Sequence, residues 1–223
     1  MKKTLAFGIV LVLLLMCVGA VSANLVKNGG FEISDPMEGW GGLSVPTMGM
    51  LNDWTVGPGD MEVIGTYWDA NGGHQSIDLS GWVRGTISQD LDTTPGQLYT
   101  LSFALSGNPY PDTNTIRRVA IYWGNDAQII LEFDTSGNTI PNNMGWEIVD
   151  DLPYFVASSD KTTLKFQDVS QNDNVAAGVA LDDIQVEPYT PTSAPEFPSS
   201  FLPAIMIIGM LGAVLLIQRT REN

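Results

Sequence analysis

Short segments in which apolar and polar residues alternate fill the middle of this chain, and this pattern restricts it to β-structure. In residues 97–106 every second side chain from Tyr99 to Leu105 is apolar, and residues 162–167 repeat the pattern around Leu164 and Phe166. Alternation places successive side chains on opposite faces of an extended strand. No part of residues 24–187 has the period of about 3.6 residues that an amphipathic helix needs. The middle of the chain is therefore predicted to be all-β.

Nine further segments of the same kind are separated by clusters of Gly, Asn, Asp and Pro. They are residues 54–56, 61–64, 75–79, 85–91, 119–123, 129–133, 146–149, 154–157 and 178–186. Short strands at this spacing predict one antiparallel β-sandwich domain over residues 24–187.

Acidic residues dominate the charge of the chain. There are 25 of them against 10 basic residues, which gives a net charge of −15. Four basic residues lie at the two ends, so only six remain between residues 24 and 194, together with 23 acidic residues. This field repels phosphate backbones, and no basic stripe is present to neutralise them. The composition therefore excludes a nucleic-acid partner.

Cysteine and histidine are almost absent from the chain. Cys17 is the single cysteine and lies in the N-terminal apolar run, and His74 is the single histidine. Disulfide frameworks, cysteine nucleophiles, thiolate zinc sites and multi-histidine metal sites are therefore excluded.

The N-terminal end has the three parts of a secretory signal peptide. Lys2 and Lys3 precede an apolar run over residues 5–18, and small residues follow as far as Ala23. This order predicts a signal peptide over residues 1–23, cleaved between Ala23 and Asn24. An uncleaved membrane anchor is the alternative, but the run is short and the small residues favour cleavage.

The C-terminal end predicts a membrane anchor on a stalk. Residues 188–200 are rich in Pro, Ser and Thr, which favours an extended stalk. Residues 201–217 form an apolar run that just suffices for a transmembrane helix, and the tail 218–223 contains Arg219 and Arg221. The positive-inside rule places this tail in the cytoplasm.

The stalk also contains a recognisable motif. Pro195, Glu196, Phe197 and Pro198, followed by the apolar helix and the Arg-containing tail, resemble the PEF-CTERM sorting signal of archaeal surface proteins. The resemblance implies recognition by a membrane-bound archaeosortase, cleavage near the motif and transfer to a lipid. An ordinary anchor that is never cleaved is the alternative. Both predict display at the extracellular face of the cell membrane.

The middle of the chain has a family resemblance along its whole length. Residues 24–32, 61–68, 75–81, 94–103 and 180–184 resemble, in this order, the choice-of-anchor C family and the related DUF642 proteins. The resemblance implies a galactose-binding-like jelly roll, that is, a carbohydrate-binding-like module.

Related jelly rolls hold a structural calcium ion between the start of the domain and its last strand. The resemblance implies Glu32, Asp182 and Asp183 as ligands, and calcium prefers such oxygen donors. The residues themselves add one observation: the apolar alternation of the last strand changes phase at Asp182 and Asp183, which predicts a β-bulge that can redirect a carboxylate. The alternative is that these carboxylates end strands and face water.

Aromatic side chains outside the clean core pattern could form a sugar platform, because ring faces stack on the apolar faces of sugars. The candidates are Trp68, Trp82, Tyr110 and Trp123. The alternative for each is a place in the core or at a sheet edge.

The sequence contains no catalytic motif such as Gly-x-Ser-x-Gly, His-Glu-x-x-His or a phosphate loop. We therefore predict a surface-anchored, non-catalytic module that binds glycans of the cell envelope or matrix. A structural coat or adhesion module that recognises proteins is the alternative, and a glycoside hydrolase with two facing carboxyl groups is a third hypothesis.

Overall fold

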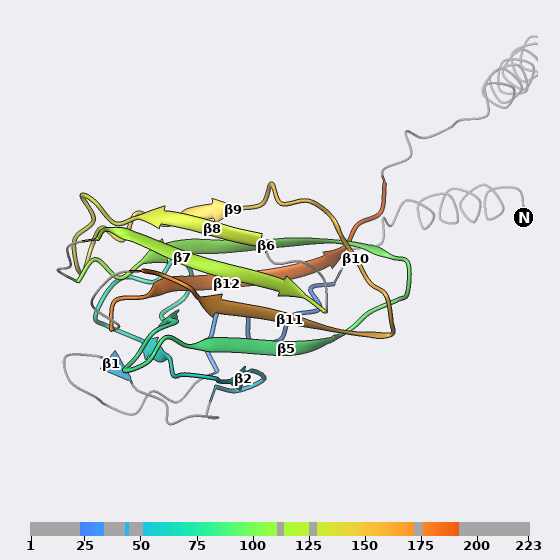
Figure 1. The fold of residues 1–223 in the computed structure, drawn as a ribbon, viewed down its shortest axis with the longest axis horizontal. Helices are drawn as coiled ribbons and strands as arrows, with labels where there is room; N and C mark the ends of the chain where they lie inside the picture. The colour runs from blue at the N-terminus through green and yellow to red at the C-terminus, as the bar shows by residue number, and fades with distance from the viewer. Residues whose placement is uncertain are drawn as a thin grey trace, which may run out of the picture. The chain divides into compact units, whose positions relative to one another are not determined.

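The computed structural model describes residues 23–33, 43–44, 51–110, 114–124, 129–171 and 176–191. Within these ranges the regular elements are twelve β-strands (Figure 1). They are β1 (Leu43–Ser44), β2 (Thr55–Val56), β3 (Glu62–Ile64), β4 (Ser76–Asp78), β5 (Thr86–Asp92), β6 (Leu98–Gly107), β7 (Ile116–Trp123), β8 (Ile129–Asp134), β9 (Glu147–Val149), β10 (Phe155–Val156), β11 (Lys161–Asp168) and β12 (Val179–Pro188).

The strands form two sheets in which every pairing is antiparallel. The seven-stranded sheet has the order β1-β3-β4-β12-β6-β10, with β9 also pairing with β6, and the five-stranded sheet has the order β2-β5-β11-β7-β8. The long strands of both sheets run along the horizontal direction of Figure 1. The predicted all-β sandwich is confirmed, and each of the eleven predicted segments overlaps a strand. Only β1 was not predicted.

Three predicted segments cannot be compared with this fold. The signal peptide as far as Ser22, the sorting motif at Pro195–Pro198 and the C-terminal apolar run lie outside the described residues. Among the residues that are described, no helix has the length and hydrophobicity needed to cross a bilayer.

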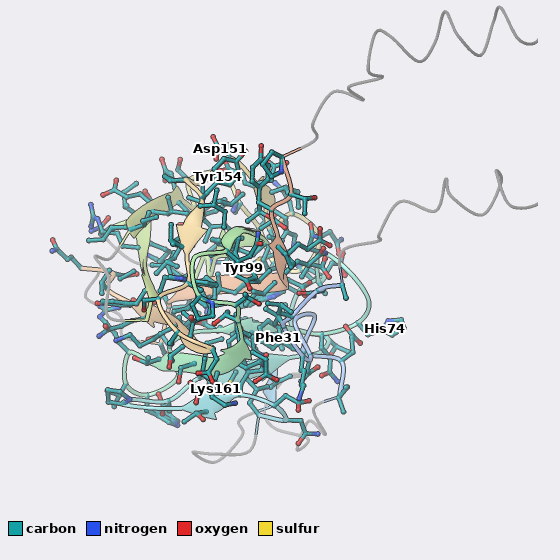
Figure 2. All side chains as sticks on the ribbon, turned by 90° about the vertical axis from the view of Figure 1, so that its right-hand side faces the viewer. Phe31, His74, Tyr99, Asp151, Tyr154 and Lys161 are labelled. Atoms are coloured by element: carbon teal, nitrogen blue, oxygen red, sulfur yellow. The ribbon has the colours of Figure 1, made fainter. Side chains whose placement is uncertain are left out.

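The core between the sheets follows from the alternation in β6 and β11. Tyr99, Leu101, Phe103 and Leu105 of β6 are all buried, and Phe103 meets Phe166 of β11 edge to face with ring centroids 5.3 Å apart. Figure 2 shows Tyr99 and Phe31 among the packed side chains. Each such side chain contributes about 1.5–3 kcal/mol through burial. Packing between the sheets therefore explains why every second side chain of these strands is apolar.

The predicted bulge in β12 is confirmed. Asp182 is aligned with Ala104 of β6, but the next aligned pair is Gln185 with Ser102, and Asp183 has a φ of 50°. The extra residue lets β12 turn apolar side chains inward on both sides of the break. It also leaves Asp182 on the outer face of the seven-stranded sheet.

A second, smaller apolar layer covers part of that outer face. Ile64, Trp68, Met144 and Ala180 are buried together there, with Trp146 packed against them. Trp68 belongs to the loop after β3, and Met144 and Trp146 belong to the loop before β9. These two loops are joined by hydrogen bonds from the Asp69 N–H to the Pro141 carbonyl (3.0 Å) and from Trp146 Nε1 to the Asp69 carbonyl (3.0 Å). Polar residues on the outer face of β4 and β12 are consequently buried instead of solvated.

Candidate functional site

Two of the four predicted platform residues are buried, which corrects the prediction for them. Trp68 is 1% exposed in the second apolar layer, and its Nε1 donates to Ser76 Oγ (2.8 Å). Trp123 is 2% exposed in the core, with its ring 5.6 Å from that of Tyr99 and 5.4 Å from that of Phe155. Neither ring has a face that a sugar could reach.

The other two platform residues are on the surface. Trp82 is 77% exposed and Tyr110 is 50% exposed. Tryptophan is highly buried on average, so an indole with this exposure is unusual for a folded domain. These two rings are the starting point for a candidate site.

The turn that carries Trp82 is held by the carboxylate of Asp60. The Trp82 N–H donates to Asp60 Oδ2 (3.0 Å) and the Val83 N–H donates to Asp60 Oδ1 (2.8 Å). A Cβ at Gly81 would lie 2.9 Å from Asp60 Oδ1, so the carboxylate fits closely against the turn. At the far side of the turn, Arg84 reaches the buried Asp168 with a separation of 3.4 Å. The turn backbone is therefore fixed on both sides of the exposed indole.

The loop that carries Tyr110 is held by Asn108. The Tyr110 N–H donates to Asn108 Oδ1 (2.9 Å). Asn108 Nδ2 in turn donates to Asp78 Oδ2 (2.8 Å) and to the Ala176 carbonyl (3.2 Å). The second ring is thus also presented from an anchored backbone.

Acidic and phenolic groups with raised pKa values accompany these two loops. Burial, followed by the charge of Asp60, raises the pKa of Glu62 to about 7. Burial also raises the pKa of Tyr67, and the charges of Tyr110, Glu62 and Asp78 raise it further. Glu62 is the residue of β3 aligned with Asp78, whose carboxylate bonds to Ser80 in the chain before Trp82 and to Asn108 in the chain before Tyr110. We call Trp82, Tyr110, Tyr67, Asp60 and Glu62 the Trp82–Tyr110 surface.

The three predicted metal ligands lie together, as expected, around the loop of residues 71–75. Glu32 Oε1 accepts the N–H groups of His74 (2.7 Å) and Gln75 (2.8 Å). Asp182 Oδ2 accepts those of Asn71 (2.9 Å) and Gly72 (3.0 Å).

Asp183 contributes through its side chain as well, since its Oδ2 accepts from Asn71 Nδ2 (2.7 Å). Burial raises the pKa of Asp182 to about 7. The three carboxylates therefore bind this loop directly.

These residues meet one requirement of a calcium site and miss another. They converge beside Gly30, where a Cβ would lie 3.4 Å from Asp183 Oδ1 and 3.8 Å from Asp182 Oδ1. In the described part of the chain, however, no group of three or more His, Cys, Asp or Glu side chains is close enough to hold a metal ion. Calcium binding by Glu32, Asp182 and Asp183 stays a prediction.

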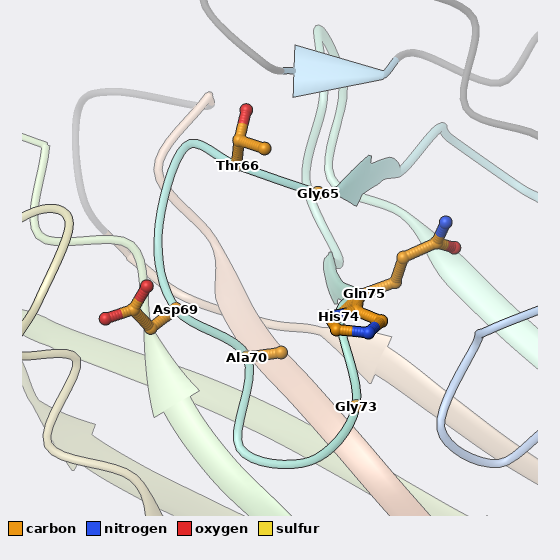
Figure 3. Close-up of a pocket in the computed structure, with 7 residues that line it drawn as sticks. All are labelled: Gly65, Thr66, Asp69, Ala70, Gly73, His74 and Gln75. Carbon is orange, nitrogen blue, oxygen red and sulfur yellow. The ribbon is translucent and has the colours of Figure 1, made fainter.

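The same loop borders a surface hollow of about 570 Å³ (Figure 3). Its lining residues are Gly65, Thr66, Asp69, Ala70, Gly73, His74 and Gln75. His74 is exposed just before β4, and Figure 2 shows it at the edge of the molecule, far from Tyr154. The hollow has no exposed large aromatic side chain among its lining residues.

Sequence reasoning did not find Asp60, Glu62 and Asp78. One signal for Asp78 was present, because it stands between the apolar residues Ile77 and Leu79 in a short strand and must face outward. Its burial was not predictable, since it depends on loops that come from elsewhere in the chain.

The fold defines a protein class, that of two-sheet antiparallel β-sandwiches. A family model described as "Protein of unknown function (DUF642)" matches residues 24–187. The chain therefore belongs to the DUF642 family, as its resemblance indicated.

One curated relative is Halomucin of Haloquadratum walsbyi, which is 30% identical over 176 residues. The match covers 76% of this chain but only 2% of Halomucin, so the chain corresponds to a very small part of that protein.

Several solved structures are similar in fold. TmCBM61, solved in complex with β-1,4-galactotriose, is 15% identical with a TM-score of 0.46, covering 75% of this chain and 100% of that chain. A cyclase from Fischerella sp. TAU is 16% identical with a TM-score of 0.49, covering 77% and 100%. A family 35 carbohydrate-binding module from Clostridium thermocellum is 12% identical with a TM-score of 0.42, covering 66% and 98%. These likenesses concern the fold.

Proposed function

We propose that this protein is a non-catalytic glycan-binding module and that the Trp82–Tyr110 surface is its binding site. The observation that carries the proposal is the position of Trp82, whose indole is largely exposed on a turn fixed by Asp60. Exposing an indole forfeits the free energy of its burial, which a binding function would explain.

The chemistry of the surface suits a carbohydrate. An indole and a phenol offer flat faces to the apolar faces of sugar rings. Asp60 bonds to the backbone N–H of Trp82 and Glu62 follows two residues later in the chain, and carboxyl oxygens accept hydrogen bonds from sugar hydroxyls. Because the turn is held before a ligand arrives, little conformational entropy is lost on binding.

We further propose that the module acts outside the cell. The sequence features that support this are the signal peptide ending at Ala23, the sorting motif beginning at Pro195 and the apolar run that follows it. The expected partners are glycans of the envelope or matrix, an archaeosortase-type enzyme, and the membrane or a transferred lipid.

Affinity electrophoresis of the purified protein in gels containing neutral polysaccharides tests the glycan-binding proposal. Wild-type protein is expected to be retarded by at least one polymer, and Trp82→Ala should lower that affinity at least about tenfold. Tyr154→Ala is the matched control. Tyr154 is as exposed as Tyr110, but it stacks on Tyr189 in another part of the domain. Equal affinities for wild type and Trp82→Ala would contradict the assignment of the surface.

A protein-recognising module is the second candidate, and one observation favours it. Ile148 of β9 and Val156 of β10 are exposed on strands that pair with β6, and Tyr154, just before β10, is exposed as well. Exposed apolar side chains on edge strands suit contact with another protein. If this candidate is correct, Val156→Lys should abolish capture of the partner while Trp82→Ala leaves it unchanged.

A further inference from the structure

We infer that Asp78 is the positioning residue of the proposed glycan-binding surface, because its single carboxylate holds both loops that carry the exposed rings. The inference rests on the proposed function, since the purpose of the positioning is ligand binding. The hydrogen bonds themselves do not depend on it and can be tested without a ligand.

The location of Asp78 puts it beneath the surface. It is the last residue of β4, aligned with Glu62 on β3 on one side and with Ala180 on β12 on the other. Aligned residues of antiparallel strands point to the same face of the sheet, so Asp78 and Glu62 share the outer face. Asp78 is fully buried, whereas Glu62 is partly exposed above it.

The two oxygens of Asp78 serve two different loops. Oδ1 accepts the Ser80 N–H (3.0 Å), two residues before Trp82. Oδ2 accepts Asn108 Nδ2 (2.8 Å), and the other end of the same amide accepts the Tyr110 N–H (2.9 Å). One rigid group thus links the Trp82 turn to the Tyr110 loop through at most one intermediate side chain.

Packing keeps the carboxylate in this orientation. A Cβ at Gly178 would lie 2.5 Å from Asp78 Oδ1, so the backbone just before β12 approaches as closely as glycine allows. Burial raises the pKa of Asp78 well above its ordinary range, and the bond from Asn108 opposes this rise. Burying a carboxylate costs desolvation free energy unless the group is fully hydrogen-bonded. The hydrogen bonds to Ser80 and Asn108 are the main contacts that offset this cost.

The critical variant is Asp78→Asn, which replaces one acceptor oxygen by an N–H donor. Its amide can keep the Ser80 N–H or the Asn108 amide as partner in the original geometry, but not both. We expect at least about a tenfold loss of affinity for the polysaccharide that retards wild type. Hydrogen exchange at the amides of Ser80 and Tyr110 should accelerate in the same variant.

Two further variants separate positioning from general stability. Combining Asp78→Asn with Asn108→Asp exchanges donor and acceptor, so the hydrogen bond between the two side chains can form again. Most of the affinity should be recovered. Recovery should be incomplete because the bond from Asn108 to the Ala176 carbonyl is lost. Thr93→Val is the control, because Thr93 is also buried but its hydroxyl bonds to the Ser159 carbonyl (2.9 Å) and to Thr162 Oγ1 (2.9 Å), away from both loops. It should leave glycan affinity and the exchange at Ser80 and Tyr110 unchanged.

Three results would overturn the inference: a folded Asp78→Asn protein with wild-type affinity, unchanged exchange at Ser80 and Tyr110, or an equal affinity loss in Thr93→Val. If Asp78→Asn does not fold, Asn108→Ala tests the Tyr110 arm, with faster exchange at Tyr110 expected and unchanged exchange overturning the inference. If wild type binds no polysaccharide, the proposed function fails, and the exchange measurements alone decide the role of Asp78.

Discussion

In two regions on the outer side of the seven-stranded sheet a buried aspartate anchors loops by hydrogen bonds, but the anchored loops expose different residues. At the Trp82–Tyr110 surface, the buried Asp78 accepts hydrogen bonds from loops that expose aromatic rings. At the loop of residues 71–75, the buried Asp182 accepts backbone N–H groups from a loop that carries glycines.

The difference lies in what the anchored loops display. The first region presents two flat rings, and the second borders an open hollow lined mainly by small and polar residues. A buried carboxylate therefore indicates an anchored loop in either place. What distinguishes the two regions is therefore the set of residues that each loop exposes.

Substituting a glycine that lies against a carboxylate in each region, Asp78 in the first and Asp183 in the second, should produce the largest contrast. A Cβ at Gly178 would lie 2.5 Å from Asp78 Oδ1 and 2.6 Å from Asp168 Oδ2, both on buried side chains. Gly178→Ala is expected to lower the free energy of unfolding by about 3 kcal/mol, the upper range for overpacking. Gly72→Ala meets Asp183 Oδ2 at 2.6 Å, but that side chain is partly exposed and can move, so about 1 kcal/mol is expected. Urea unfolding would show the difference, and equal losses would contradict it.

Calcium would change the second region from a hydrogen-bonded anchor to an ion-bridged one. If Glu32, Asp182 and Asp183 bind calcium, the ion at one hundred times its Kd should stabilise the native state by about 2.7 kcal/mol. Thermal unfolding with calcium and with chelator measures this, and Glu32→Ala should remove the difference. Identical Tm values in both buffers would end the metal proposal and leave the N–H bonds as the sole anchor proposed for this loop.

Loss of the Glu32 carboxylate should weaken the second region alone. Glu32→Ala, measured in chelator, removes the acceptor of the His74 and Gln75 N–H groups. Because Glu32 is exposed, the expected loss is about 1 kcal/mol, or roughly 2–4 °C in Tm. Glycan affinity should not change. A parallel loss of affinity would show that the two regions are coupled.

The pH dependence of stability should mark the first region. The folded-state pKa of Glu62 is about 7 against an ordinary value of 4.5, so the native state holds this proton more tightly. The resulting stabilisation is complete below about pH 4.5 and is lost as the pH rises through 7. Burial raises the pKa of Asp78 and Asp168 in the same direction.

The variant Glu62→Gln measures the contribution of Glu62 to this pH dependence. Between pH 5 and pH 8 the Tm of the variant should fall by roughly 2 °C less than that of wild type, a small difference because Glu62 is partly exposed. Tm measured across this range would check it, and an unchanged slope would contradict the assignment.

The sequence predicted the parts of the site that depend on local pattern. The bulge at Asp182 and Asp183 was visible as a change of phase in the apolar alternation, and the structure confirms it. Trp82 and Tyr110 follow turn-forming residues, and both are exposed. Trp68 was mispredicted because its neighbours carry no periodicity, and the loops that bury it meet only in the folded chain.

The sequence by itself determined the strands and their inward faces, because alternation along one strand is a local property that burial between two sheets satisfies. Only the tertiary structure decided which outward-facing residues are covered. Asp78 and Trp68 lie beneath loops, whereas Trp82 remains exposed. The coverage depends on contacts such as that between Asp69 and Pro141, which are far apart in the chain and leave no repeating pattern in it.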